Sequence, residues 1–108
     1  MMKMLIKFDE EKIEREGEYD LEKIEKLLND EFAKRGIHKD EEGFYVDGNF
    51  VTFGSMILGL SKMDWFLDNA AEWLWYDSEG QIDPNAYGVE ELLEHYRRKR
   101  AKERGIRA

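Results

Sequence analysis

Two histidines and twenty-five carboxylates are the side chains of this 108-residue chain that could hold a metal ion or transfer a proton. His38 and His95 lie far apart, and only Glu91, four residues before His95 on an expected helix, could share a metal ion with it. The chain has no cysteine, which excludes disulfides, thiolate zinc sites, iron–sulfur clusters and a cysteine nucleophile. Acid–base catalysis needs a carboxyl group with a shifted pKa in a cleft, and no pattern indicates one.

Glycine motifs that bind phosphate or present a nucleophile are also missing, since the sequence has no P-loop, no G-x-G-x-x-G and no G-x-S-x-G. Gly54-Ser55, expected between a strand and a helix, could meet an anion, but the dipeptide is too short to be specific. Asp77, Glu79 and Asp83 resemble a calcium loop only loosely, because its glycine falls at the fourth position instead of the sixth. We therefore expect no enzyme activity, no metal and no cofactor.

The charges are unevenly distributed along the chain, whose net charge is −8. Residues 97–108 hold seven bases and one acid, a net charge of +6, and the remaining residues hold ten bases and 24 acids, a net charge of −14. Residues 63–96 have nine acids and no lysine or arginine. Such a body repels nucleic acid and attracts basic partners, whereas the basic tail either contacts the acidic body or binds nucleic acid weakly.

Five aromatic residues gather within the same base-free stretch: Trp65, Phe66, Trp73, Trp75 and Tyr76. One interpretation places them in the core, because aromatic side chains bury large areas. The other leaves some of them at the surface within a rim of acids, where they would anchor a protein partner. This second interpretation predicts an interaction surface made of Trp65, Asp68, Trp73, Trp75, Tyr76 and Asp77.

The elements that would position these residues predict one α+β domain over residues 1–108. Residues 3–8 alternate between apolar and charged, which indicates a strand. A helix is predicted near residues 20–35, with Asp20 as its cap and Gly36 after its end. Aromatic and β-branched residues around Asp47-Gly48 predict a hairpin near residues 44–53, which would complete a small antiparallel sheet.

The second half of the chain is expected to be mainly helical. Apolar spacing predicts helices near residues 54–72 and 88–103, while residues 73–76 fit a helix or a strand equally well. Residues 9–18 are expected to form a loop with a helical turn at most. Residues 97–108 form the basic helical tail.

The N-terminal apolar stretch is interrupted by Lys7 and followed by Asp9, Glu10 and Glu11, so we expect no signal peptide. The longest apolar run elsewhere, residues 56–60, is far shorter than a membrane span. We therefore expect a cytoplasmic protein without a membrane partner.

Three segments of the C-terminal half, residues 65–69, 72–78 and 89–96, together resemble a pattern in small uncharacterised proteins of conjugative and other mobile elements of Firmicutes. The resemblance implies a cytoplasmic accessory protein, and it implies no catalytic residues. Gly88 departs from the pattern, where a side chain that caps the helix would be expected. We predict a non-enzymatic interaction protein that binds a protein partner and does not bind nucleic acid directly. A DNA mimic that inhibits restriction, CRISPR or other DNA-binding proteins is the alternative, and a homodimer stays open.

Overall fold

The strand predicted at residues 3–8 organises the sheet. The computed structural model describes residues 2–76 and 92–105. In it β1 (Lys3–Phe8) pairs along its whole length with β4 (Ala70–Tyr76), and both β4 and β3 (Tyr45–Val46) run antiparallel to it. β3 pairs in turn with β2 (His38–Lys39), which gives the strand order β2-β3-β1-β4. The predicted α+β fold with a small antiparallel sheet is confirmed.

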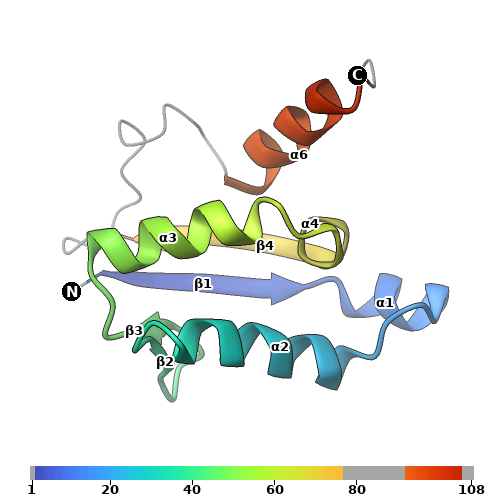
Figure 1. Cartoon of the computed structure of the whole chain (residues 1–108). Helices are drawn as coiled ribbons and strands as arrows, with labels where there is room; N and C mark the ends of the chain where they lie inside the picture. Colours follow the sequence, from blue (N-terminus) through green and yellow to red (C-terminus); the bar gives the residue numbers. More distant parts are fainter. Residues whose placement is uncertain (1, 77–91, 106–108) are drawn as a thin grey trace.

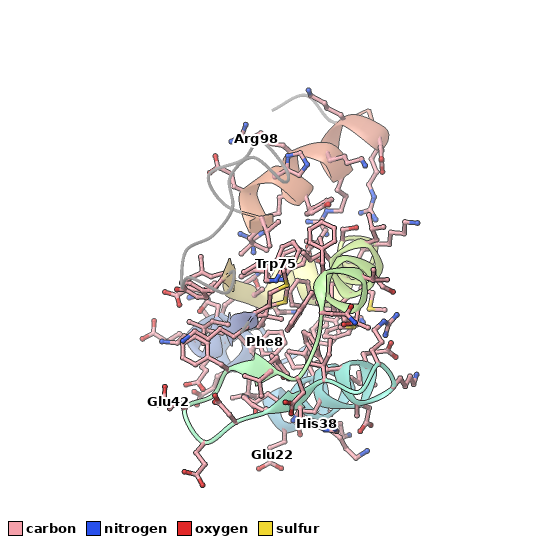
Figure 2. The ribbon with its side chains drawn as sticks, turned by 90° about the vertical axis from the view of Figure 1, so that its left-hand side faces the viewer. Phe8, Glu22, His38, Glu42, Trp75 and Arg98 are labelled. Atoms are coloured by element: carbon pink, nitrogen blue, oxygen red, sulfur yellow. The ribbon has the colours of Figure 1, made fainter. Side chains whose placement is uncertain are left out.

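One side of the sheet carries the core. Met4 faces Trp75 and Ile6 faces Trp73 across β1 and β4, and all four side chains are buried. Two helices, α2 (Leu21–Ala33) and α3 (Phe50–Leu60), cover this side (Figure 1). Their buried residues join the same core: Leu28, Phe32, Phe53, Met56, Ile57 and Leu60. Figure 2 shows Trp75 in the interior, between α3 and the strands.

The helix predicted at residues 20–35 is confirmed as α2. The Asp20 side chain accepts hydrogen bonds from the backbone N–H groups of Glu22 and Lys23, as expected for an N-cap. Gly36, just past the helix, has a φ of 73°, the left-handed conformation that glycine adopts without strain.

The hairpin predicted at residues 44–53 is wrong, because Phe50–Leu60 forms α3. Asn49 accepts a hydrogen bond from the backbone N–H of Thr52 at 2.9 Å, and Thr52 Oγ1 accepts one from the N–H of Asn49 at 2.8 Å. This reciprocal capping box starts a helix directly after Asp47-Gly48. The dipeptide therefore leads into a helix instead of turning between two strands.

The actual hairpin lies earlier in the chain and joins β2 to β3. The Asp40 side chain accepts hydrogen bonds from the N–H groups of Glu42 and Phe44, both at 2.9 Å. Gly43 has a φ of 94°, which side chains rarely tolerate. This turn leaves β3 only two residues long.

The single helix predicted at residues 54–72 is also wrong. α3 ends at Leu60, a short helix α4 (Asp64–Asn69) follows, and β4 begins at Ala70. The strand forms because β1 offers a full-length pairing edge, and Trp73 and Trp75 alternate with outward-facing residues. Residues 73–76, which fitted a helix or a strand, therefore belong to a strand.

Two further helices complete the described part of the fold. α1 (Glu10–Glu16) replaces the expected loop, with Asp9 as its N-cap, Gly17 at its end and Ile13 buried. α6 (Leu92–Glu103) lies beside β4 and α4 (Figure 1) and holds most of the predicted helix at 88–103. Residues 88–91 and 106–108 lie outside the described residues. No helix of the described part is long and apolar enough to cross a membrane.

Candidate functional site

The aromatic surface predicted from the sequence does not form as a unit. Trp73 is fully buried and Trp75 is 7% exposed, so both belong to the core. The Trp73 indole N–H donates to Met4 Sδ at 3.3 Å, and its ring packs against Phe66 and Tyr96. A small domain gains most by burying its largest apolar side chains, and a tryptophan buries more area than almost any other side chain. This explains the placement of both residues in the core.

The other residues of that predicted surface are divided between two places. Trp65 is partly buried against the core and lies on α4 with Asp68, whose carboxylate is 2.8 Å from Arg100. Tyr76 lies on β4, where its ring meets Phe44 edge to face. Asp77 lies outside the described residues. Trp65 and Tyr76 therefore do not share a surface with the two buried tryptophans.

The basic tail explains why the acids around Trp65 are not free for a partner. Arg104 Nη2 lies 2.7 Å from Asp64 Oδ1, and Arg100 contacts both Asp64 and Asp68, at 3.1 and 2.8 Å. The hydrogen bond from Arg104, assisted by Arg100, lowers the pKa of the Asp64 carboxyl. Of the two interpretations of the tail, contact with the acidic body is the one observed for these arginines.

A third arginine of the tail holds the backbone. Arg97 Nε donates to the carbonyl oxygen of Leu67 and Arg97 Nη2 to that of Ala70, each at 2.8 Å. These carbonyls lie where α4 ends and β4 begins, and the end of a helix leaves carbonyl groups without partners. Arg98, by contrast, points away from the sheet on α6 (Figure 2) and pairs only with Glu94 among the described residues.

The candidate metal and anion sites do not assemble in the described residues. No group of three histidine or acidic side chains comes together there in a way that could hold a metal ion. His38 is exposed on β2, and His95 on α6 packs against the ring of Tyr96. Gly54-Ser55 lies inside α3, so its expected place between a strand and the start of a helix is wrong. Glu91 and the loose calcium pattern at residues 77–83 lie outside the described residues.

A groove along the edge of β1 has a volume of about 560 Å³. Residues 5–11 line one wall, and Glu25 and Leu28 of α2 line another. Lys39, Glu42, Gly43 and Tyr45 of the hairpin close one end, and Ala71 of β4 also contributes. Successive side chains of a strand point to opposite faces, so a hollow on one face would be lined by every second residue. This hollow is lined by four consecutive strand residues, 5–8, and therefore follows the edge of the strand. We call this feature the edge groove.

The edge groove exists because β3 is short. Among the described residues of β3, only Tyr45 has a pairing partner in β1, namely Met4. Figure 1 shows the β2–β3 hairpin beside the start of β1, with α2 running along the rest of it. The later part of β1 therefore has a strand on the β4 side and the groove on the other.

The lining of the edge groove is acidic. It contains Asp9, Glu10, Glu11, Glu25 and Glu42 against two lysines, Lys7 and Lys39, a net charge of −3. None of these five acids forms an ion pair within residues 2–76 and 92–105, while Lys7 lies 3.9 Å from Glu72 and Lys39 lies over the ring of Tyr45. Burial, and then the nearby charge of Glu25, raise the pKa of Tyr45 above its ordinary value.

Sequence reasoning did not find this groove. The acids at residues 9–11 follow a strand directly, which is a visible signal of charge at the end of that strand. The groove, however, also depends on where β3 stops, and the incorrect hairpin concealed that. A second exposed feature was also missed: α3 has no charged residue, and Val51 and Leu58 on it are 75% and 56% exposed.

Comparisons of the chain with models of protein families, with curated proteins and with solved structures give no match. The setting in a mobile element therefore stays a prediction from the sequence pattern.

Proposed function

We propose that this chain is a non-enzymatic accessory protein of the cytoplasm, which acts by binding a basic protein partner at the edge groove. The mobile-element setting implied by the resemblance belongs to the same proposal. One observation supports it above all: the acids that line the groove have no ion pair among the described residues, while the acids beside Trp65 are paired with α6. The proposed surface is therefore acidic, as predicted, but its position differs from the aromatic segment.

Electrostatics favours a basic partner over a neutral one. Bringing a lysine or arginine to Glu10, Glu11 or Glu42 breaks no described ion pair, so the gain is not offset by a lost contact. The net charge of −8 adds a long-range attraction that speeds association at low ionic strength. The partly exposed Leu5 supplies apolar contact area in the same groove.

The test uses two variants with the same change in net charge. The groove variant carries Glu10→Gln, Glu11→Gln, Glu25→Gln and Glu42→Gln. The control variant carries four substitutions at exposed acids outside the groove: Glu14→Gln, Glu16→Gln, Glu22→Gln and Glu41→Gln. Each chain is used to capture partners from a host lysate at low salt, and the partner that the wild type retains is then purified for binding measurements.

We expect the control variant to bind that partner with nearly wild-type affinity and the groove variant to lose binding. Binding of the wild type should also weaken as salt rises, because the contacts are ionic. Equal affinity of the two variants would place the binding surface elsewhere and overturn the proposal. Leu58→Asp, which changes the exposed face of α3, then shows whether that face is used instead.

DNA mimicry stays the alternative, in which the basic partner is a DNA-binding protein and the carboxylates occupy phosphate positions. It differs in one measurable consequence. Duplex DNA should displace the chain from its purified partner if the chain mimics DNA, and should leave the complex intact if the partner's basic segment is unrelated to DNA binding.

A further inference from the structure

We infer that the edge groove receives an extended basic segment of the partner, which adds to the sheet as a strand beside β1. This inference rests on the proposed function for the identity of the site. It goes further by specifying how the partner binds: through backbone hydrogen bonds to the free edge of β1, with lysine or arginine side chains reaching the acids of the groove.

The pairing pattern of β1 supports this mode of binding. All six residues from Lys3 to Phe8 have a partner in β4, whereas on the opposite edge, among residues 2–76 and 92–105, only Met4 has one, Tyr45 of β3. The turn held by Asp40 and Gly43 comes directly before Tyr45, and no described residue of the hairpin pairs with Leu5 to Phe8. A strand edge of this kind presents N–H and C=O groups that a further strand can pair with.

The walls of the groove suit an extended chain with alternating side chains. Leu28 and Tyr45 are buried on the core side of the groove, and the partly exposed Leu5 and Phe8 offer the apolar surface where apolar side chains of an added strand would pack. Glu10, Glu11 and Glu42 are exposed, where basic side chains of the same strand would lie. Because side chains alternate along a strand, a segment with alternating apolar and basic residues satisfies both walls.

Charge argues against a second copy of this chain as the occupant. Pairing of two β1 edges would bring together two linings of net charge −3, on chains of net charge −8 each. Like charges across such an interface oppose association. A different role for these acids would be to block pairing of the open edge with any other strand, as charges at sheet edges do. In that case no peptide would bind there.

The experiment uses the full chain and a probe peptide, acetyl-Lys-Val-Lys-Val-Lys-Val-Lys-amide. Two matched peptides have the same charge and side chains, but one is N-methylated at the valines and the other at the lysines. In an added strand only alternate N–H groups point to β1, and the burial of the valines together with the direction of the strand fixes which set does. Binding is measured by NMR titration, and protection of the β1 amides by hydrogen exchange.

We expect the unmodified peptide to bind, to protect amides between Leu5 and Phe8, and to lose affinity with the groove variant. We expect one N-methylated peptide to bind about tenfold more weakly than the other, since it lacks two or three backbone hydrogen bonds. Equal affinity of the two methylated peptides, or no binding of any peptide, would overturn the added strand. A dimer of the free chain in sedimentation that the groove variant strengthens would overturn it as well.

The two proposals fail in different ways. If the groove variant loses the purified partner while the methylated peptides bind equally, the proposed function stands and strand addition is wrong. If the methylated peptides differ as expected while the partner binds the groove variant as tightly as the wild type, strand addition stands and the proposed function is wrong.

Discussion

Arg104 and Asp64 form an ion pair of 2.7 Å, although they lie 40 positions apart in the chain. With Arg100, which contacts the same carboxylate at 3.1 Å, this pair joins α6 to the start of α4. Part of the positive charge of the basic tail, residues 97–108, is thus paired with acids of the same chain. Lys102 is exposed, and Arg98 points outward and pairs with Glu94 on its own helix.

We expect Asp64→Asn to loosen α6 without unfolding the chain. The substitution removes two arginine contacts at once, while Leu93 and Tyr96 still hold α6 in the core. Amide exchange in α6 should become faster, and the free energy of unfolding should change little, since exposed ion pairs contribute little. Asp30→Asn is the matched control, because Asp30 is similarly exposed but pairs with Lys26 on its own helix.

Arg97 should be more important for stability than its neighbour Arg98. Its guanidinium donates to two backbone carbonyls that would lose these partners in Arg97→Ala. We expect a loss of about 1–2 kcal/mol in the free energy of unfolding, measured by urea denaturation. Arg98→Ala should cost less, because its ion pair with Glu94 is exposed. Arg97→Lys should not restore the full loss, because an ammonium group lacks the planar fork that meets both carbonyls.

Those parts of the fold that depend on local pattern were predictable from the sequence. Strand 3–8 alternates in hydrophobicity, and helix 20–35 has a capping Asp20 and a terminal Gly36, so both were identified with nearly correct bounds. Residues 44–53 have the composition of a hairpin, but Asn49 and Thr52 cap a helix there. A strong short-range turn signal was thus overruled by a helix cap and by the core that Phe53, Met56 and Ile57 complete.

The candidate site could not be predicted, because it depends on a contact between distant segments. The acids at residues 9–11 are visible in the sequence, but Glu25 and Glu42 join them only through the packing of α2 and the hairpin. In the same way, pairing of residues 70–76 with β1 decided that Trp73 and Trp75 are core residues. Periodicity over so few residues did not distinguish this strand from a helix.

Asn49→Ala tests the helix cap that replaced the expected hairpin. Loss of the side-chain oxygen leaves the N–H of Thr52 without its partner, so we expect a loss of about 1 kcal/mol in the free energy of unfolding. Asn49→Asp keeps an oxygen in the same position and should retain most of the stability. If the alanine variant were as stable as the wild type in urea denaturation, the capping box would contribute nothing.

Trp73→Ala should be the most destabilising of the tryptophan substitutions. Its side chain is fully buried between Met4, Phe66 and Tyr96, and a large-to-small change there costs about 3–5 kcal/mol. Trp65→Ala, at a partly buried position, should cost about 1 kcal/mol. Comparable losses for both variants in urea denaturation would contradict the separation of the tryptophans into core and periphery.

The attachment of α6 should depend on pH in the acidic range. The hydrogen bond from Arg104, with help from Arg100, holds the pKa of the Asp64 carboxyl below its ordinary value. A carboxyl whose pKa is lowered by folding contributes stability that is fully present above the unfolded pKa, about 3.9, and is lost as the pH falls through the folded pKa. Attachment should therefore be constant above pH ~5 and weaken only below pH ~4.

The carbon-13 shift of the Asp64 carboxyl reports its titration, and the α6 amide shifts report attachment. The hydrogen bond from Lys34 also lowers the pKa of Glu31 on α2, so the same titration of Asp64→Asn is the necessary control. A transition of α6 that persists unchanged in that variant would show that another carboxyl controls it.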